Sequence, residues 1–133
     1  MSENGLQGKR VLVVGGETEL GRAVLIGLAE AGADIAIASL TADTQAEFAI
    51  NSALNELWVL GRKGVALAID ASDAEMLRRA AEQAESELGP FDLVVVVGDV
   101  ATEALAGRDT IELAPDAAQD EALTTIKVRL QGG

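Results

Sequence analysis

Three side chains that carry much of enzyme chemistry are missing from this sequence of 133 residues, which has no cysteine, no histidine and no tyrosine. Without cysteine, neither a disulfide framework nor a thiolate metal site can form. Without histidine, the commonest general base and metal ligand is absent. The phenol of tyrosine, which can act as a proton donor, is absent as well. These absences narrow the chemistry that the chain can perform.

Aromatic residues are also scarce, at 2% of the sequence, although 49% of the residues are hydrophobic. The core must therefore be built from valine, leucine, isoleucine and alanine, as in a sheet covered by helices on both faces. The length is sufficient for one domain with its own core and too short for two domains of ordinary size. We expect residues 1–133 to form a single domain.

Positive charge is scarce too, because 10 basic residues stand against 22 acidic ones and the net charge is −12. Such a surface repels phosphate backbones and anionic lipids, so we expect neither nucleic acid nor membrane as a partner. The first ten residues lack the apolar segment of a secretory signal. The apolar runs at residues 65–69 and 93–97 are far shorter than a membrane span. We expect a cytoplasmic protein.

Predicted strands alternate with predicted helices along the chain. Apolar runs rich in β-branched residues predict strands at residues 10–15, 34–39, 65–70 and 92–97. Helical spacing and capping patterns predict helices at residues 19–31, from Thr41 or Asp43 to 60, from Ser72 with Glu75 as a capping box to 88, and from Pro115 to 130. The polar segment 99–109 is predicted to be a loop. This order requires parallel strands, so the predicted fold is α/β, a doubly wound, Rossmann-like sheet of about four strands with flanking helices.

A glycine-bearing turn follows the first predicted strand, with the sequence VGGETELG at residues 14–21. Glycines at such a turn permit positive φ, close approach of a pyrophosphate to the backbone, and tight packing of the helix on the strand. The start of the following helix supplies free N–H groups and the positive end of the helix dipole. The spacing alone is a weak signal, and its position between the first strand and the first helix strengthens it.

The segment from residue 10 onward resembles the opening of a short-chain dehydrogenase/reductase. The family's Thr-Gly-x-x-x-Gly-x-Gly loop falls on residues 14–21, and residues 69–73 resemble its Asp-Val-x-Asp segment. Residues 92–99 take the place of the fourth strand and its Asn-Asn-Ala-Gly ending. Residues 113–116 and 127–132 resemble the helix that carries the active-site asparagine. The likeness spans nearly the whole chain, and it implies the NAD(P)-binding portion of an oxidoreductase.

The resemblance also implies which residues bind the cofactor. Four residues of the turn would meet the pyrophosphate, a carboxylate and the next backbone amide would hold adenine, and a glycine would let the ribose approach. The implied set is Gly15, Thr18, Leu20, Gly21, Asp70, Ala71 and Gly98. Asp70 has an equal alternative as a polar residue that ends a strand. An acidic residue after the second strand favours NAD and a basic one NADP; Ser39-Leu40 is neither, so the choice between NAD and NADP stays open.

Several positions depart from the family pattern. Glu19 replaces the middle glycine, and its carboxylate either opposes the pyrophosphate or points outward and stabilises the helix by about 0.3–1 kcal/mol. We favour the outward orientation. Val14 replaces the threonine that usually ties the loop together. Val96 and Val97 replace polar residues, and Arg129 stands where the asparagine would be. Glu17 adds a second acid to the turn.

We expect no catalytic residue within this chain. The family's serine and Tyr-x-x-x-Lys motif would follow the region present here, and without tyrosine no phenol can protonate a carbonyl oxygen during hydride transfer. The chain alone is therefore expected to be inactive as a reductase. Acidic residues at Asp99, Glu103 and Asp109 could suggest a divalent cation, but scattered acids are common in so acidic a chain. We expect no metal site.

An alternative function is a degenerate, non-enzymatic Rossmann module that acts in binding or oligomeric assembly. The departures from the family pattern support it. The apolar strand at residues 92–97 supports it too, because at the edge of a sheet it would be a pairing liability. We therefore expect a homo-oligomer, most simply a dimer, formed through that edge or through the face of the last helix at residues 117–130. Trp58 is expected to serve in packing or in partner contact.

Overall fold

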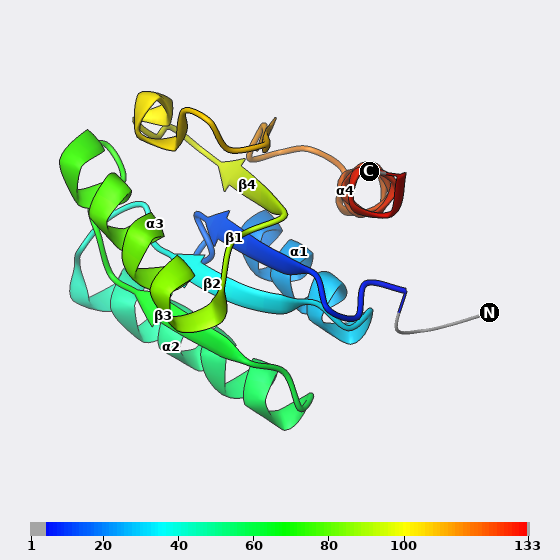
Figure 1. The fold of residues 1–133 in the computed structure, drawn as a ribbon. Helices are drawn as coiled ribbons and strands as arrows, with labels where there is room; N and C mark the ends of the chain where they lie inside the picture. Colours follow the sequence, from blue (N-terminus) through cyan, green and yellow to red (C-terminus); the bar gives the residue numbers. More distant parts are fainter. Residues whose placement is uncertain (1–4, 133) are drawn as a thin grey trace.

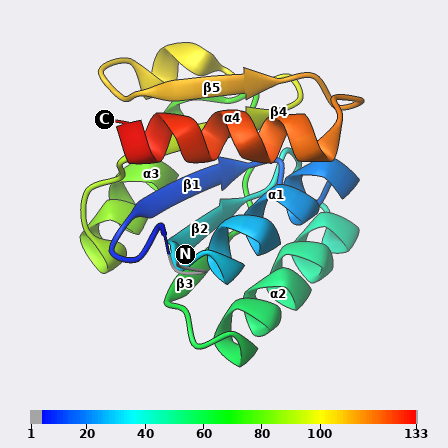
Figure 2. The same cartoon turned by 90° about the vertical axis from the view of Figure 1, so that its right-hand side faces the viewer.

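The computed structural model describes residues 5–132, which form a five-stranded parallel sheet between two layers of helices (Figures 1 and 2). The strands are β1 (Arg10–Val14), β2 (Asp34–Ala38), β3 (Gly64–Leu67), β4 (Leu93–Val97) and β5 (Thr110–Leu113). The helices are α1 (Glu19–Glu30), α2 (Thr44–Val59), α3 (Ala74–Leu88) and α4 (Gln119–Gly132), with a short 3-10 helix, η1 (Thr102–Leu105). The strand order β3-β2-β1-β4-β5 reverses direction at β1, which confirms the predicted doubly wound fold.

The core lies on both faces of this sheet. Alternate residues of β1 point to opposite faces: Val11 and Val13 pack with α1, α2 and α4, whereas Leu12 and Val14 pack with α3 and η1. Figure 2 shows α4, α1 and α2 side by side over one face. All five residues of β4 are buried. The continuous aliphatic runs in the sequence therefore correspond to strands that are covered on both sides.

The strand β5 was not predicted, and it changes the position of β4. It begins directly after the segment 99–109, which was predicted to be a loop and contains η1. It pairs in parallel with β4, from Val94 opposite Thr110 to Val97 opposite Leu113. Because β5 covers β4, the edges of the sheet are β3 and β5, and the prediction that residues 92–97 form an exposed edge was wrong. The strand β4 therefore offers no free edge through which a dimer could form.

Two helices begin at other residues than predicted. Asp73, not Ser72, caps α3: its carboxylate accepts hydrogen bonds from the amides of Glu75 (3.0 Å) and Met76 (3.2 Å). The chain turns after Pro115, so α4 begins at Gln119. The buried apolar residues of α4 are Ala122, Ile126 and Leu130, and they lie in the core shared with α1 and α2. This apolar face is thus used inside the domain.

Candidate functional site: the carboxyl edge of the sheet

The turn between β1 and α1 closes against the ends of the neighbouring strands. The amides of Gly15 and Gly16 donate to the Ala38 carbonyl oxygen at the end of β2, at 2.8 and 3.2 Å. Gly15 has a φ of +96°, and a Cβ at this position would lie 2.3 Å from the Val97 carbonyl oxygen at the end of β4. Only glycine satisfies both the positive φ and the close approach. The turn therefore lies over three adjacent strand ends.

Thr18 holds this turn together. Its hydroxyl donates to the Gly15 carbonyl oxygen (2.7 Å) and accepts from the Gly21 amide (2.9 Å), which makes it the N-cap of α1. A Cβ on Gly21 would lie 2.0 Å from the same Gly15 oxygen. At Val14 we expected the loss of a tie within the loop, because the family has threonine there. The structure shows that Thr18 provides one, while Val14 is buried in the core.

The same turn leaves backbone donors without a protein partner. Within residues 5–132, no group accepts a hydrogen bond from the amides of Glu17, Glu19 and Leu20. These amides lie at the start of α1, where N–H groups lack intrahelical acceptors and the helix dipole is positive. The Glu19 side chain is exposed, as expected for the outward orientation. The turn thus offers donors suited to an anion.

Glu17 and Leu40 connect this turn to the other strand ends. Both carboxylate oxygens of Glu17 accept from the Leu40 amide just beyond β2, at 2.8 and 3.1 Å. The Leu40 carbonyl oxygen accepts from the Ala71 amide (2.9 Å), and the Leu40 side chain lies against Gly98. From the sequence, Leu40 was distinguished only by being neither acidic nor basic. Since Glu17 and Leu40 are 23 residues apart, no local pattern could have revealed the contact.

Asp70 and Ala71 lie beyond β3 on the same edge. The Asp70 carboxylate is exposed and accepts from the Ser72 hydroxyl (2.6 Å) and the Ser72 amide (3.0 Å). These two hydrogen bonds, the hydroxyl first, lower the pKa of Asp70 below its ordinary value. The Ala71 amide is engaged by Leu40. With Gly98 at the end of β4, at a φ of +107°, all seven expected cofactor residues lie at the carboxyl edge.

The half of this edge near β4 and β5 is more open than the half around the turn after β1. A cavity of about 430 Å³ opens there, lined by Gly98, Asp99, Glu112, Leu113, Ala114 and Pro115. Its acidic side chains are exposed. In the part of the chain that the structure describes, no three histidine, cysteine or acidic residues are grouped so that they could hold a metal ion. None of the described helices is long and apolar enough to cross a membrane.

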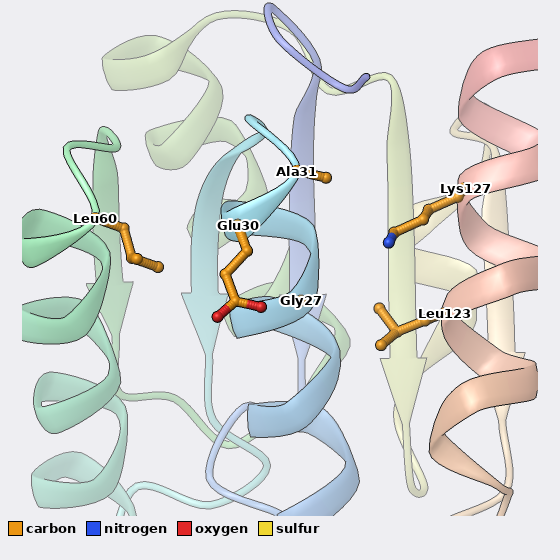
Figure 3. Close-up of a pocket in the computed structure, with 6 residues that line it drawn as sticks. All are labelled: Gly27, Glu30, Ala31, Leu60, Leu123 and Lys127. Atoms are coloured by element: carbon orange, nitrogen blue, oxygen red, sulfur yellow. The ribbon is translucent and has the colours of Figure 1, made fainter. Parts of the chain in front are cut away.

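A second cavity lies away from this edge. It has a volume of about 580 Å³ and is lined by Gly27, Glu30, Ala31, Leu60, Leu123 and Lys127. Figure 3 shows Leu123 and Lys127 reaching from α4 toward α1, with Leu60 approaching from the end of α2. Because α1 starts at the carboxyl edge, its last turn lies at the opposite edge of the sheet. We therefore treat this cavity as separate from the candidate site.

Comparisons with known proteins agree with this architecture. The family model described as short chain dehydrogenase matches residues 9–130. The L-rhamnose 1-dehydrogenase (NAD(P)(+)) of Sphingomonas sp. (strain SKA58) is 36% identical over 90 residues, 68% of this chain and 34% of that protein. A short chain dehydrogenase of Pseudocercospora fijiensis is 35% identical over 96 residues, 72% of this chain and 29% of that protein. The chain thus spans about a third of the length of these curated relatives.

Solved structures give the same result. The structure of a blue fluorescent protein from a metagenomic library, in complex with NADPH, is similar with a TM-score of 0.64 and 35% identity, covering 68% of this chain and 36% of that one. A short-chain dehydrogenase/reductase of Serratia marcescens has a TM-score of 0.64 and 27% identity, covering 96% of this chain and 49% of that one. Since the family match extends over nearly all of the sequence, the chain belongs to the short chain dehydrogenase family.

Proposed function

We propose that this chain is the NAD(P)-binding portion of a short-chain dehydrogenase-like oxidoreductase and carries no catalytic residue itself. The observation that carries the proposal is the turn after β1, where the unpaired amides of Glu17, Glu19 and Leu20 meet the positive end of α1. Backbone amides at a helix N-terminus are a common binding site for phosphate groups. Gly15, Thr18, Leu20 and Gly21 would surround the pyrophosphate.

The remaining proposed contacts follow the strand ends outward from the turn. Asp70 and Ala71, beyond β3, would lie beside adenine, and Gly98 would leave room for the ribose. The Ala71 amide already donates to Leu40, so an adenine contact at this amide requires the hydrogen bond to be shared or broken. The names of the relatives support a nicotinamide nucleotide, since one is an NAD(P)(+) dehydrogenase and one structure holds NADPH.

The residues of this chain would bind and orient the nucleotide rather than move protons. A bound nicotinamide nucleotide supplies hydride chemistry. The sequence contains no tyrosine and no histidine that could transfer a proton to a carbonyl oxygen. We therefore propose that nucleotide binding and reductase activity are separate properties, and that the 133-residue chain has only the first.

Titration of the chain with NADH, followed by nucleotide fluorescence, tests the proposal. We expect a dissociation constant in the micromolar range, and no binding at millimolar nucleotide would contradict it. Amide NMR spectra of the labelled chain locate the contact, because the signals of Glu17, Glu19 and Leu20 should shift on saturation. The amide of Gly107, in the turn before β5, serves as the internal control and should not shift.

A matched pair of variants links binding to the turn. Thr18→Val removes the hydroxyl that holds Gly15 and Gly21 in place, so we expect weaker NADH binding. Thr124→Val makes the same change at an exposed position on α4 and should leave binding unchanged. Circular dichroism of both variants verifies that the fold is retained.

A second candidate function is a non-enzymatic module that acts in binding or oligomeric assembly. It is favoured by the outer face of α2, where Phe48, Trp58 and Val59 have exposed fractions of 77%, 58% and 86%. Exposed apolar groups of this kind often mark contact with a partner. Light scattering of the chain with and without Val59→Asp tests it: a dimer that dissociates in the variant, together with no NADH binding, would favour this function over the first.

A further inference from the structure

The carboxyl edge of the sheet beyond β2 holds an acidic side chain, that of Glu17, which comes from the turn after β1 and not from β2 itself. We propose that Glu17 accepts hydrogen bonds from the adenosine ribose hydroxyls and makes the site prefer NAD to NADP. This inference rests on the proposed function and deepens it, because it names the form of the nucleotide and the residue that selects it.

Glu17 lies where a Rossmann sheet places the acid that binds the ribose. In Rossmann sheets the ribose hydroxyls meet an acidic residue at the end of the second strand. Here Ser39 follows β2 but is fully buried, and its hydroxyl is hydrogen-bonded to the Ile69 carbonyl (3.2 Å) and amide (2.9 Å). Leu40, the next residue, is apolar. The Leu40 amide instead holds the carboxylate of Glu17 at this location, so the turn after β1 supplies the acid that the end of β2 lacks.

Glu17 also keeps hydrogen-bonding capacity for the ribose hydroxyls. An ionised carboxylate has about four lone-pair sites on its two oxygens. The Leu40 amide is a single donor that approaches both oxygens at 2.8 and 3.1 Å. The carboxylate is therefore fixed in position while keeping acceptor sites for two hydroxyl groups. The Glu17 side chain is half-buried, so water competes less with a ligand for these acceptor sites.

Among the described residues, the surroundings of Glu17 carry negative charge and no free cation. A cavity of about 260 Å³ adjoins it, lined by Glu17, Thr41, Asp43, Gln45, Ala46 and Ala49. None of these lining residues is lysine or arginine. The Ala46 amide and then the Thr41 hydroxyl lower the pKa of Asp43, so its carboxylate is ionised at neutral pH. Arg22, the next basic residue after the turn, is paired with Glu56.

A 2′-phosphate would therefore meet two carboxylates and no neutralising cation. At neutral pH a phosphate monoester carries a charge of about −1.5 to −2, and its repulsion from one nearby carboxylate, even in water, is sufficient to weaken NADP binding by about tenfold relative to NAD. Because part of this repulsion acts through solvent, the preference should decrease as the salt concentration rises.

Calorimetric titration of the full chain with NAD⁺ and with NADP⁺ tests the inference. We expect about tenfold tighter binding of NAD⁺. Glu17→Gln keeps an oxygen acceptor for the Leu40 amide but removes the charge, so it should narrow the ratio to about twofold, mainly through tighter NADP⁺ binding. Glu82→Gln, an exposed position on α3, changes the net charge equally and should leave the ratio unchanged.

Equal affinity, or tighter binding of NADP⁺, would overturn the inference and leave the proposed function intact, and so would a ratio that Glu17→Gln does not change. If neither nucleotide binds, the proposed function fails and the inference fails with it. Should Glu17→Gln not fold, Asp43→Asn replaces it, because asparagine also caps helices; it should narrow the ratio by a smaller factor, and an unchanged ratio would count against the inference.

Discussion

The two halves of the carboxyl edge differ in what holds them together. At the turn after β1, the close contacts are between backbone atoms: a Cβ on Gly15 would meet the Val97 carbonyl, and one on Gly21 would meet the Gly15 carbonyl. At the end of β4, the atoms nearest to a Cβ on Gly98 belong to the side chain of Leu40, the first at 2.9 Å. The first half is thus defined by backbone geometry, and the second by a side chain that can move.

This difference explains how the chain keeps the family's turn while losing several of its side chains. Glu19 replaces a glycine at an exposed helix start, and Val14 lies in the core while Thr18 ties the turn. At the end of β4, Val96 and Val97 are buried in the core. They stand where the family has polar side chains, and they supply no polar group in their place. A turn that is defined by its backbone keeps its shape when exposed or buried side chains are replaced. Chemistry that depends on particular side chains is lost when those side chains are replaced.

The largest expected effect distinguishes the two halves directly. Gly15→Ala combines a positive φ with a backbone clash, and we expect it to lower the free energy of unfolding by about 4 kcal/mol. Gly98→Ala should cost less, because Leu40 can move away. Gly107→Ala is the control: its φ is +87° with nothing within 4 Å of the added Cβ, so only about 1–2 kcal/mol is expected. Urea denaturation measures all three. Equal losses at Gly15 and Gly107 would show that the close approach is unimportant.

A medium effect is expected where β5 is attached to the rest of the fold. The Glu85 carboxylate on α3 accepts from Arg108, before β5, at 2.7 Å, and the two side chains are only 26% and 22% exposed. Glu85→Ala leaves the guanidinium without this partner, so we expect a loss of about 2 kcal/mol. Urea denaturation of Glu85→Ala beside Glu82→Ala, an exposed acid on the same helix, measures it. Similar losses in both variants would contradict the prediction.

A smaller effect is expected at the N-cap of α1. Thr18→Val removes one hydroxyl and keeps the shape of the side chain, so it should cost about 1 kcal/mol of stability. Thr18→Ser retains the hydroxyl and should be nearly as stable as the original chain. Thermal denaturation followed by circular dichroism compares the two, and a valine variant as stable as the serine variant would mean that the turn holds without this tie.

The smallest expected effect is on how the stability of the fold depends on pH. Burial alone would raise the pKa of Glu85, but its hydrogen bonds with Arg108 and the Phe91 amide and the charge of Arg108 together lower it. A carboxyl whose pKa is lower in the folded state stabilises the fold above its unfolded pKa of about 4.3, and this contribution is lost as the pH falls through the folded pKa. Stability measured from pH 6 downward should therefore fall less steeply in Glu85→Gln than in the original chain. Parallel curves would rule out this contribution.

Much of the fold could be predicted because its signals are local. The apolar runs of β1, β2 and β4 and the helical spacing of α1 to α3 each lie within one segment, so periodicity identified them. The strand β5 could not be recognised in this way: it has four residues, of which only Ile111 is buried. Its pairing with β4 depends on a neighbour supplied by the fold, and this pairing determines which strands form the edges.

The sequence by itself determined the doubly wound sheet and the place of the glycine turn, because strand period, helix period and turn glycines are properties of neighbouring residues. Only the tertiary structure decided that Thr18 closes the turn from within and that Glu17 reaches the amide of Leu40. It also decided that Leu40 joins the ends of three strands. The physical reason is that parallel pairing brings together strand ends that are far apart along the chain, and the contacts between them exist only once the sheet has formed.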